Sequence, residues 1–125
     1  MLAGMKLQAA IPLFRIFDYS LAKAFYLDWL GFHLDWEHQF SPKSPRYLQI
    51  SRDATILHLT EHYGDATPGS KAFIHLDDVA ALHHELHSRP NPNMNPGIED
   101  APWGARILEV TDPFGNRLCF NQMVK

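Results

Sequence analysis

The stretch that decides the fold is residues 102–120, PWGARILEVTDPFGNRLCF. Its centre, 112–116, consists mainly of turn formers, because Asp supplies a side-chain acceptor, Pro a fixed φ, and Gly and Asn tolerate a positive φ. Apolar-rich runs at 105–110 and 118–120 flank this turn, which predicts two β-strands joined as a hairpin. Trp103 lies just upstream, between a proline and a glycine, where it is either a rigid aromatic platform for a ligand or a plug at the end of the core.

Length and composition limit the class of protein. The chain has 125 residues, of which 46% are apolar and 20% charged, as expected for one soluble globular domain spanning 1–125. A net charge of −3 without a basic run argues against a nucleic acid partner. No stretch approaches the ~20 apolar residues of a membrane span, and no signal peptide is visible. The single cysteine, Cys119, favours a reducing cytoplasm. We therefore expect a cytoplasmic protein whose partner is a small molecule or another protein.

The rest of the chain repeats one order of elements. Both repeats, at about 8–61 and 71–122, have the order β-α-β-β-β, although the middle strand of the second is weakly signalled. The expected strands are 8–17, 32–37, 47–51, 55–61, 72–76, a short one near 94–98, and the closing hairpin; the expected helices are 21–30 and 79–89. The sequence predicts an α+β fold in which two tandem βαβββ units form a half-open, curved mixed sheet with helices outside. Its concave face would suit a small molecule.

Local signals mark the ends of these elements. Asp18 or Ser20 is expected to cap the first helix, and Gly31 to end it. Leu21, Phe25 and Trp29 recur every four residues and predict its apolar face. The next strand, 32–37, alternates apolar and polar residues, which indicates that one of its faces is buried. Asp77 or Asp78 should cap the second helix, and Pro12 predicts that the first strand lies at a sheet edge or a bulge.

Four pieces of the sequence carry a resemblance to a known family. They are Phe17-Asp18, Phe25-Tyr26 followed by Leu30-Gly31-Phe32, the segment 74–82, and Asp112-Pro113-Phe114-Gly115-Asn116. Their order and spacing, with the βαβββ repeat, resemble the glyoxalase/bleomycin-resistance/extradiol-dioxygenase (vicinal oxygen chelate) superfamily. Pro102-Trp103-Gly104 followed by Arg106 looks most like the bleomycin-resistance branch. That resemblance implies a homodimer with drug-binding clefts between subunits, near the closing hairpin.

Metal-dependent members of that superfamily carry His or Glu ligands on four strands of the concave face. Aligned by eye, the corresponding positions here are Ile11, His58, Lys71 and Cys119. Isoleucine cannot ligate and lysine is a poor ligand at neutral pH, so fewer than the three protein ligands of a catalytic zinc site remain. We therefore expect no cofactor and no catalytic residue. If a divalent metal such as Zn, Ni, Mn or Fe does bind, the candidates are His58, His75 and Glu109.

Aromatic side chains dominate the expected ligand contacts. The residues expected to bind the ligand are Trp103, Trp36, Phe40, Tyr47, His58 and Arg106. Trp36 and Tyr47 could equally belong to the core, and His58 either enters the concave face or is a hydrogen-bonded core histidine. The acidic residues Glu61, Asp65, Glu99 and Asp100 either complement a cationic ligand or are simply solvated. His83 and His87 lie four apart on the second helix, where a solvated histidine-rich face is expected.

Three functions fit this pattern. The preferred hypothesis is a metal-free, drug-binding antibiotic-resistance protein that sequesters an aromatic or cationic molecule, such as bleomycin, in a homodimer. The alternative is a metal-dependent glyoxalase-, lyase- or dioxygenase-type enzyme of the same superfamily with a rearranged metal site. A ligand sensor or dimerisation module without resistance or catalysis is the third.

Overall fold

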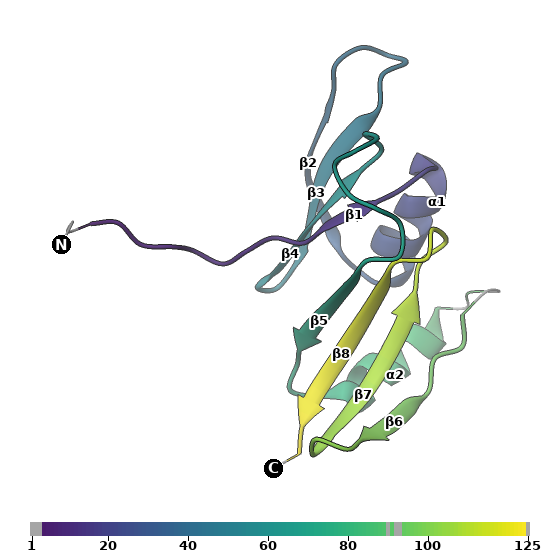
Figure 1. Ribbon diagram of the computed structural model, residues 1–125. Coiled ribbons are helices and arrows are strands. Elements are labelled where there is room, and N and C mark those ends of the chain that lie inside the picture. Colours follow the sequence, from purple (N-terminus) through teal and green to yellow (C-terminus); the bar gives the residue numbers. More distant parts are fainter. Residues whose placement is uncertain (1–3, 90, 92–93, 125) are drawn as a thin grey trace.

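The computed structural model describes residues 4–89, 91 and 94–124, and its elements follow the predicted order (Figure 1). The predicted α+β fold of two tandem βαβββ units is confirmed. The boundaries predicted for the domain (1–125) and for its repeats stay predictions, and residues 1–3, 90, 92–93 and 125 lie outside the described residues. The elements are β1 (Leu13–Arg15), α1 (Tyr19–Lys23), the π-helical segment η1 (Ala24–Trp29), β2 (His33–Gln39), β3 (Arg46–Arg52), β4 (Thr55–Thr60), β5 (Lys71–His75), α2 (Val79–Ser88), β6 (Ile98–Ala101), β7 (Ala105–Thr111) and β8 (Arg117–Met123).

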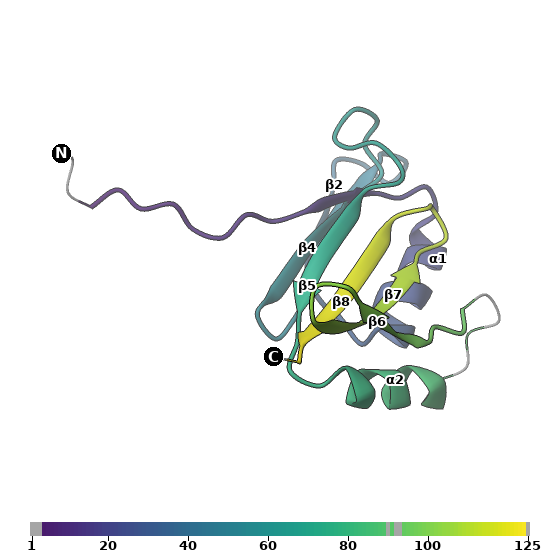
Figure 2. The same cartoon turned by 60° about the horizontal axis from the view of Figure 1, so that its bottom comes forward.

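The strands form two four-stranded sheets of identical topology. Their orders are β1-β4-β3-β2 and β5-β8-β7-β6. In each sheet the first strand of the unit pairs in parallel with the last, and the other neighbours are antiparallel. Figure 2 shows α2 along one side of the second sheet. The two repeats predicted from the sequence therefore have the same pattern of strand pairing.

The first strand is much shorter than predicted. The prediction of a strand over 8–17 is wrong in length, because only Leu13–Arg15 pair with β4. Pro12 accepts a hydrogen bond from the amide of His58 (2.9 Å) but has no N–H to donate, and β1 begins directly after it, at the edge of the sheet. Residues 4–11 lead away from both sheets as an extended arm (Figures 1 and 2).

The weakly signalled strand lies further along the chain than predicted. It was expected near 94–98 and is found at Ile98–Ala101. Its position follows from pairing with β7, in which Ile98 lies opposite Leu108 and Ala101 opposite Ala105. Tertiary pairing, not local propensity, decides where this edge strand begins.

The first helix begins as predicted and then changes its hydrogen bonding. Asp18 is the N-cap, and its side chain accepts from the amide of Leu21 (2.9 Å). From Ala24 the segment is π-helical, and the amide of Leu30 donates to the carbonyl of Phe25 (2.9 Å). Gly31, at φ +76°, ends it in a conformation that favours glycine. Leu21, Phe25 and Trp29 line one cavity and so share the predicted apolar face, but Leu21 is 51% exposed whereas Phe25 and Trp29 are buried.

One core of buried apolar side chains joins the two units between the helices and the sheets. Trp29 in η1 also donates through Nε1 to the carbonyl of Leu86 in α2 (3.1 Å). Asp78 caps α2 by accepting from the amide of Ala81 (3.0 Å). The largest fully buried side chains come from both halves: Phe14, Ile16, Tyr26, Leu30, Leu48, Ile50, Leu57, Leu59, Val79, Leu86, Leu108 and Leu118. In the described part of the chain, no helix is long and apolar enough to cross a membrane.

Candidate functional site

Strand alternation leaves one face of each sheet free of helix. In β3, Leu48 and Ile50 are buried in the core, so Tyr47 and Gln49 point to the opposite face. In β4, His58 lies between the buried Leu57 and Leu59 and therefore shares the helix-free face with Tyr47. The expectation that His58 lies opposite its apolar neighbours is met by this burial pattern.

A β-bulge adds Trp36 to the helix-free face. Leu34 lies opposite Ile50, but the register shifts and Trp36 lies opposite Gln49. Simple alternation would place Trp36 on the same face as Leu34, towards the core. The extra residue at Asp35 turns Trp36 to the other face, where its side chain is 44% exposed.

Trp36, Tyr47 and His58 form an aromatic cluster. The rings of Trp36 and Tyr47 are stacked, with centroids 6.0 Å apart and an interplanar angle of 10°. The His58 ring meets both edge-on, at 5.4 Å from Trp36 and 5.1 Å from Tyr47. Side chains from the three neighbouring strands β2, β3 and β4 thus make one partly exposed surface, which we call the N-terminal cluster.

Hydrogen bonds determine the tautomer of His58. Its Nε2 donates to Oε1 of Gln49 (2.9 Å), which can only accept, so Nδ1 is left to accept from the hydroxyl of Tyr47 (2.6 Å). Gln49 in turn donates through Nε2 to Asp35 (3.1 Å), the residue at the bulge. Burial lowers the pKa of His58, which favours this neutral form. Burial, followed by the charge of Asp65, raises the pKa of Tyr47, so its hydroxyl keeps its proton.

Trp103 lies over the helix-free face of the second sheet. It belongs to the turn between β6 and β7, is 52% exposed, and donates through Nε1 to Oδ1 of Asn121 in β8 (2.8 Å). Its ring centroid is 6.5 Å from that of Phe73, which lies 5.2 Å from the ring of His75. Trp103, Phe73, His75 and Asn121 constitute the C-terminal cluster. Trp103 is a half-exposed surface residue, and sequence reasoning missed Phe73 and Asn121, whose roles depend on strand register.

Two of the expected ligand residues lie outside both clusters. Phe40, in the loop between β2 and β3, is 86% exposed. In β7, Ile107 lies opposite Asn121 of the C-terminal cluster. Arg106 is the residue before it and lies opposite Asp100 and Gln122. The side chain of Arg106 therefore projects from the helix side of the second sheet, away from Trp103.

The acidic residues named from the sequence divide into two kinds. Glu61 accepts from the amide of Arg46 (2.8 Å), and Asp65 accepts from the hydroxyl of Thr60 (2.8 Å). Glu99 and Asp100 are exposed on the edge strand β6. Glu61 and Asp65 thus stabilise the local backbone and loop of the first unit.

The candidate metal ligands do not converge. His58 belongs to the first sheet, whereas His75 and Glu109 belong to the second. Glu109 forms an ion pair with Lys71 (2.9 Å) and approaches Arg117 (3.9 Å). Cys119, opposite Glu109 in β8, is buried, and its burial raises its pKa. Within the described ranges, no three His, Cys, Asp or Glu side chains come together as a metal site.

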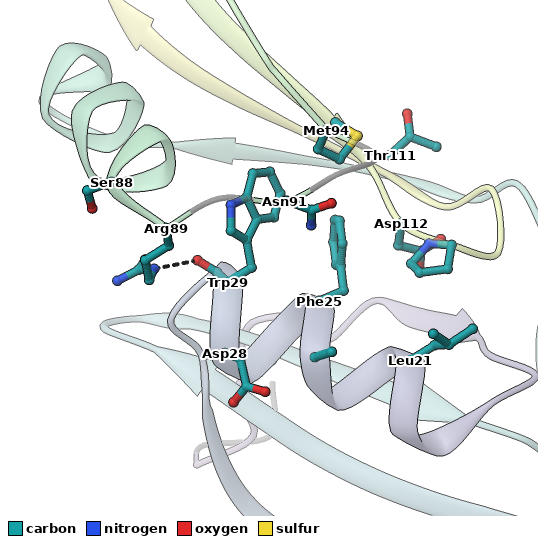
Figure 3. A pocket seen from close by; sticks show the side chains of 12 residues that line it. Leu21, Phe25, Asp28, Trp29, Ser88, Arg89, Asn91, Met94, Thr111 and Asp112 are labelled. Carbon is teal, nitrogen blue, oxygen red and sulfur yellow. Dashed lines mark hydrogen bonds between the residues drawn. The ribbon is translucent and has the colours of Figure 1, made fainter.

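A separate cavity lies on the helix side of the molecule. This cavity, of about 990 Å³, lies between α1 and η1, the end of α2 and the turn after β7. Figure 3 shows Phe25 and Trp29 projecting from η1 towards Asn91 and Met94. None of the ligand residues expected from the sequence lines this cavity. The sequence pattern predicts Phe25 and Trp29 on the apolar face of the first helix, and both are nearly fully buried.

Comparisons with known proteins agree with this fold. A family model described as "Glyoxalase superfamily protein" matches residues 1–125. Among curated proteins, none matches the chain. The chain is similar to the bleomycin-binding protein of Streptomyces verticillus, solved with copper(II)-bleomycin, at 26% identity over 97% of this chain and 99% of the other, with a TM-score of 0.68.

Two further solved structures extend this comparison. An antibiotic-binding protein from Streptomyces sp. CB03234 is 26% identical over 95% of this chain and 99% of its own, with a TM-score of 0.65. A glyoxalase family protein from Enterococcus faecalis shares the fold at 16% identity, over 92% of this chain and 97% of the other, with a TM-score of 0.68.

Proposed function

The chain belongs to the glyoxalase superfamily, as its sequence motifs predicted, and from that premise we propose that it binds and sequesters a small aromatic or cationic antibiotic, such as bleomycin. Binding would take place in a cleft of a homodimer, in the cytoplasm, without metal or catalysis. The observation that carries the proposal is the cluster of Trp36, Tyr47 and His58 on a helix-free sheet face.

The chemistry of the N-terminal cluster suits a planar or cationic ligand. Aromatic faces attract a cation by ~0.5–1 kcal/mol when exposed and by ~2 kcal/mol when desolvated. His58 is neutral and held by Gln49 and Tyr47, so it adds ring surface without adding positive charge. Asp35 adds a carboxylate at the edge of the cluster, and its hydrogen bonds from Gln49 and Ser51 lower its pKa. A ligand with aromatic rings and a positive charge would meet complementary groups here.

A second copy of the chain would complete the cleft. The N-terminal cluster lies on the first sheet and the C-terminal cluster on the second, and among the described residues no ring pair joins the two. Large apolar side chains are exposed on the arm and on the second sheet: Met5, Leu7, Phe73 and Met123. Exposed apolar surface of this kind favours association. Two structural relatives are described as binding bleomycin and an antibiotic, respectively, which supports a ligand of that class.

The enzymatic alternative requires a metal at His58, His75 and Glu109. The ion pair between Glu109 and Lys71 competes with metal ligation at that carboxylate. We therefore favour binding over catalysis. Elemental analysis of dialysed His87→Gln protein, which lacks the histidine pair of α2, separates the two functions, because stoichiometric Zn, Ni, Mn or Fe in it would overturn the metal-free proposal.

Fluorescence titration with metal-free bleomycin tests the proposal directly. Trp36 and Trp103 are exposed, whereas Trp29 is buried, so the comparison with Trp36→Ala identifies which quenching comes from the N-terminal cluster. We expect saturable quenching by bleomycin in the wild type, and Trp36→Ala should weaken binding by roughly 3- to 30-fold. Tyr63→Ala is the matched control, because Tyr63 is 91% exposed and belongs to neither cluster. The absence of quenching and of calorimetric heat at high micromolar bleomycin would contradict the proposal.

A further inference from the structure

Asn121 presents a buried hydrogen-bond donor without a partner. Its side chain is fully buried, and its Oδ1 accepts from Nε1 of Trp103 (2.8 Å). Among the described residues, its Nδ2 has no hydrogen-bond partner. The indole N–H can only donate, so the amide oxygen must face Trp103 and the NH2 group must point away from it. Buried donors without a partner are rare in native proteins, and each one calls for an explanation.

The register of β8 places this donor on the helix-free face. Asn121 lies between His75 of β5 and Ile107 of β7, two positions from the pair of Phe73 and Cys119. Side chains two positions apart in a strand share a face. The donor therefore lies beneath the aromatic rim of the C-terminal cluster, in which Phe73, His75 and Trp103 are all exposed.

We propose that Nδ2 of Asn121 donates a hydrogen bond to a carbonyl or carboxamide oxygen of the small molecule, at a subsite covered by Trp103. This inference rests on the proposed function and adds a chemical class to it. An NH2 group pairs with an acceptor oxygen and disfavours an ammonium group at the same point. Specificity would then be divided, because the N-terminal cluster suits aromatic and cationic groups, and Asn121 selects a neutral acceptor.

Access to the donor depends on Trp103. This side chain is half exposed and is held by a single hydrogen bond at a turn whose next residue, Gly104, has φ +82°. Rotation of the indole would break that one bond without moving a strand and would open the side of the amide on which Trp103 lies. Asn121 is thus both a positioning residue for Trp103 in the free protein and a donor to the ligand in the complex.

Asn121→Asp tests the donor specifically. Aspartate keeps an oxygen that accepts from Trp103 but replaces NH2 with a second acceptor. We expect this variant to bind metal-free bleomycin about tenfold more weakly, which is the effect of losing one hydrogen bond. Gln122→Glu is the matched control, since it makes the same exchange at the next residue, where Oε1 accepts from the amide of Val79 on the opposite face (2.8 Å). Asn121→Leu serves as a second variant if the buried aspartate prevents folding.

A second readout separates this inference from the proposed function. In NMR spectra, benzamide should shift the side-chain NH2 resonances of Asn121, whereas benzylamine, which has no carbonyl group, should not. If bleomycin binds the wild type, Asn121→Asp and Asn121→Leu equally well, the inference is wrong and the proposed function stands. If bleomycin does not bind but benzamide shifts the resonances, the subsite at Asn121 is supported and the proposal that bleomycin is the ligand is wrong. If neither bleomycin nor benzamide shifts the NH2 resonances of Asn121, water or a second copy of the chain accepts its hydrogen bond, and the inference is overturned.

Discussion

The hydroxyl of Tyr26 donates a hydrogen bond of 2.6 Å to Oδ2 of Asp112, a residue 86 positions further along the chain. The two residues belong to two of the motifs from which the family was first inferred, and Figure 1 shows the turn after β7 lying next to α1. Oδ1 of Asp112 also accepts from the amides of Phe114 and Asn116 (2.8 Å each), and Asn116 donates through Nδ2 to the carbonyl of Arg15 (2.8 Å). The closing turn therefore joins the second unit to the first.

Removing the hydroxyl of Tyr26 should destabilise the fold. Tyr26→Phe leaves the buried carboxylate of Asp112 with one donor fewer, and we expect the free energy of unfolding to fall by about 1–3 kcal/mol. Equilibrium unfolding in urea measures this change in the free energy of unfolding. Tyr63→Phe makes the same change at an exposed site and should alter stability by less than ~0.5 kcal/mol. Equal effects of the two variants would contradict a structural role for the bond.

Glu85 should make the protein sensitive to acid. It pairs with Arg52 (2.7 Å) and Arg89, and Arg52 also donates to the carbonyl of Leu30 (2.8 Å). The hydrogen bond from Arg52, with that from Arg89, lowers the pKa of Glu85 from 4.5 to about 2. A lowered pKa stabilises the fold above pH 4.5, and this stability is lost as the pH falls towards 2.

The acid sensitivity of Glu85 is measurable by substitution. Allowing for solvent screening of these partly exposed groups, we expect about 2 kcal/mol of pH-dependent stability between pH 5 and pH 2. Glu85→Gln should abolish that part of the pH dependence. Glu99→Gln, on the exposed edge strand, should keep the wild-type slope, and a shared slope in all three proteins would refute the assignment.

His58 should titrate below the ordinary histidine range. Its burial lowers the pKa from 6.5, so the folded protein takes up this proton later than the unfolded chain as the pH falls. Consequently the His58 contribution lowers stability progressively below about pH 6.5. NMR titration of its ring protons should give a midpoint below that of the same protein unfolded in urea. A midpoint above the unfolded value would show that the neutral tautomer bonded to Tyr47 and Gln49 is misassigned.

The outer face of α2 should bind a transition metal through two histidines. The rings of His83 and His87 are stacked with centroids 4.0 Å apart, one helical turn from each other. Imidazoles at this spacing suit Ni(II) and Cu(II). Ni(II) at ten times its dissociation constant should raise the free energy of unfolding by about 1.4 kcal/mol. His87→Gln should lose this effect and His84→Gln should retain it, whereas equal losses would indicate unspecific binding.

Local chemistry made much of the fold predictable. The caps at Asp18 and Asp78, the end of the first helix at Gly31 and the hairpin around 112–116 all depend on interactions within a few residues. Such signals are present in the sequence itself, because each residue favours its conformation through its own side chain. The order of elements, and from it the repeated βαβββ topology, followed from them.

Tertiary structure decided which residues meet. The bulge at Asp35 moves Trp36 to the helix-free face, and the register of β7 separates Arg106 from Trp103. The unpaired donor of Asn121 exists only because β5, β7 and β8 lie side by side. A one-residue shift in strand register moves every side chain that follows to the opposite face of the sheet. The register itself depends on pairing between strands that are distant in the sequence. The sequence by itself therefore determined the elements and their order, whereas strand register determined the candidate site.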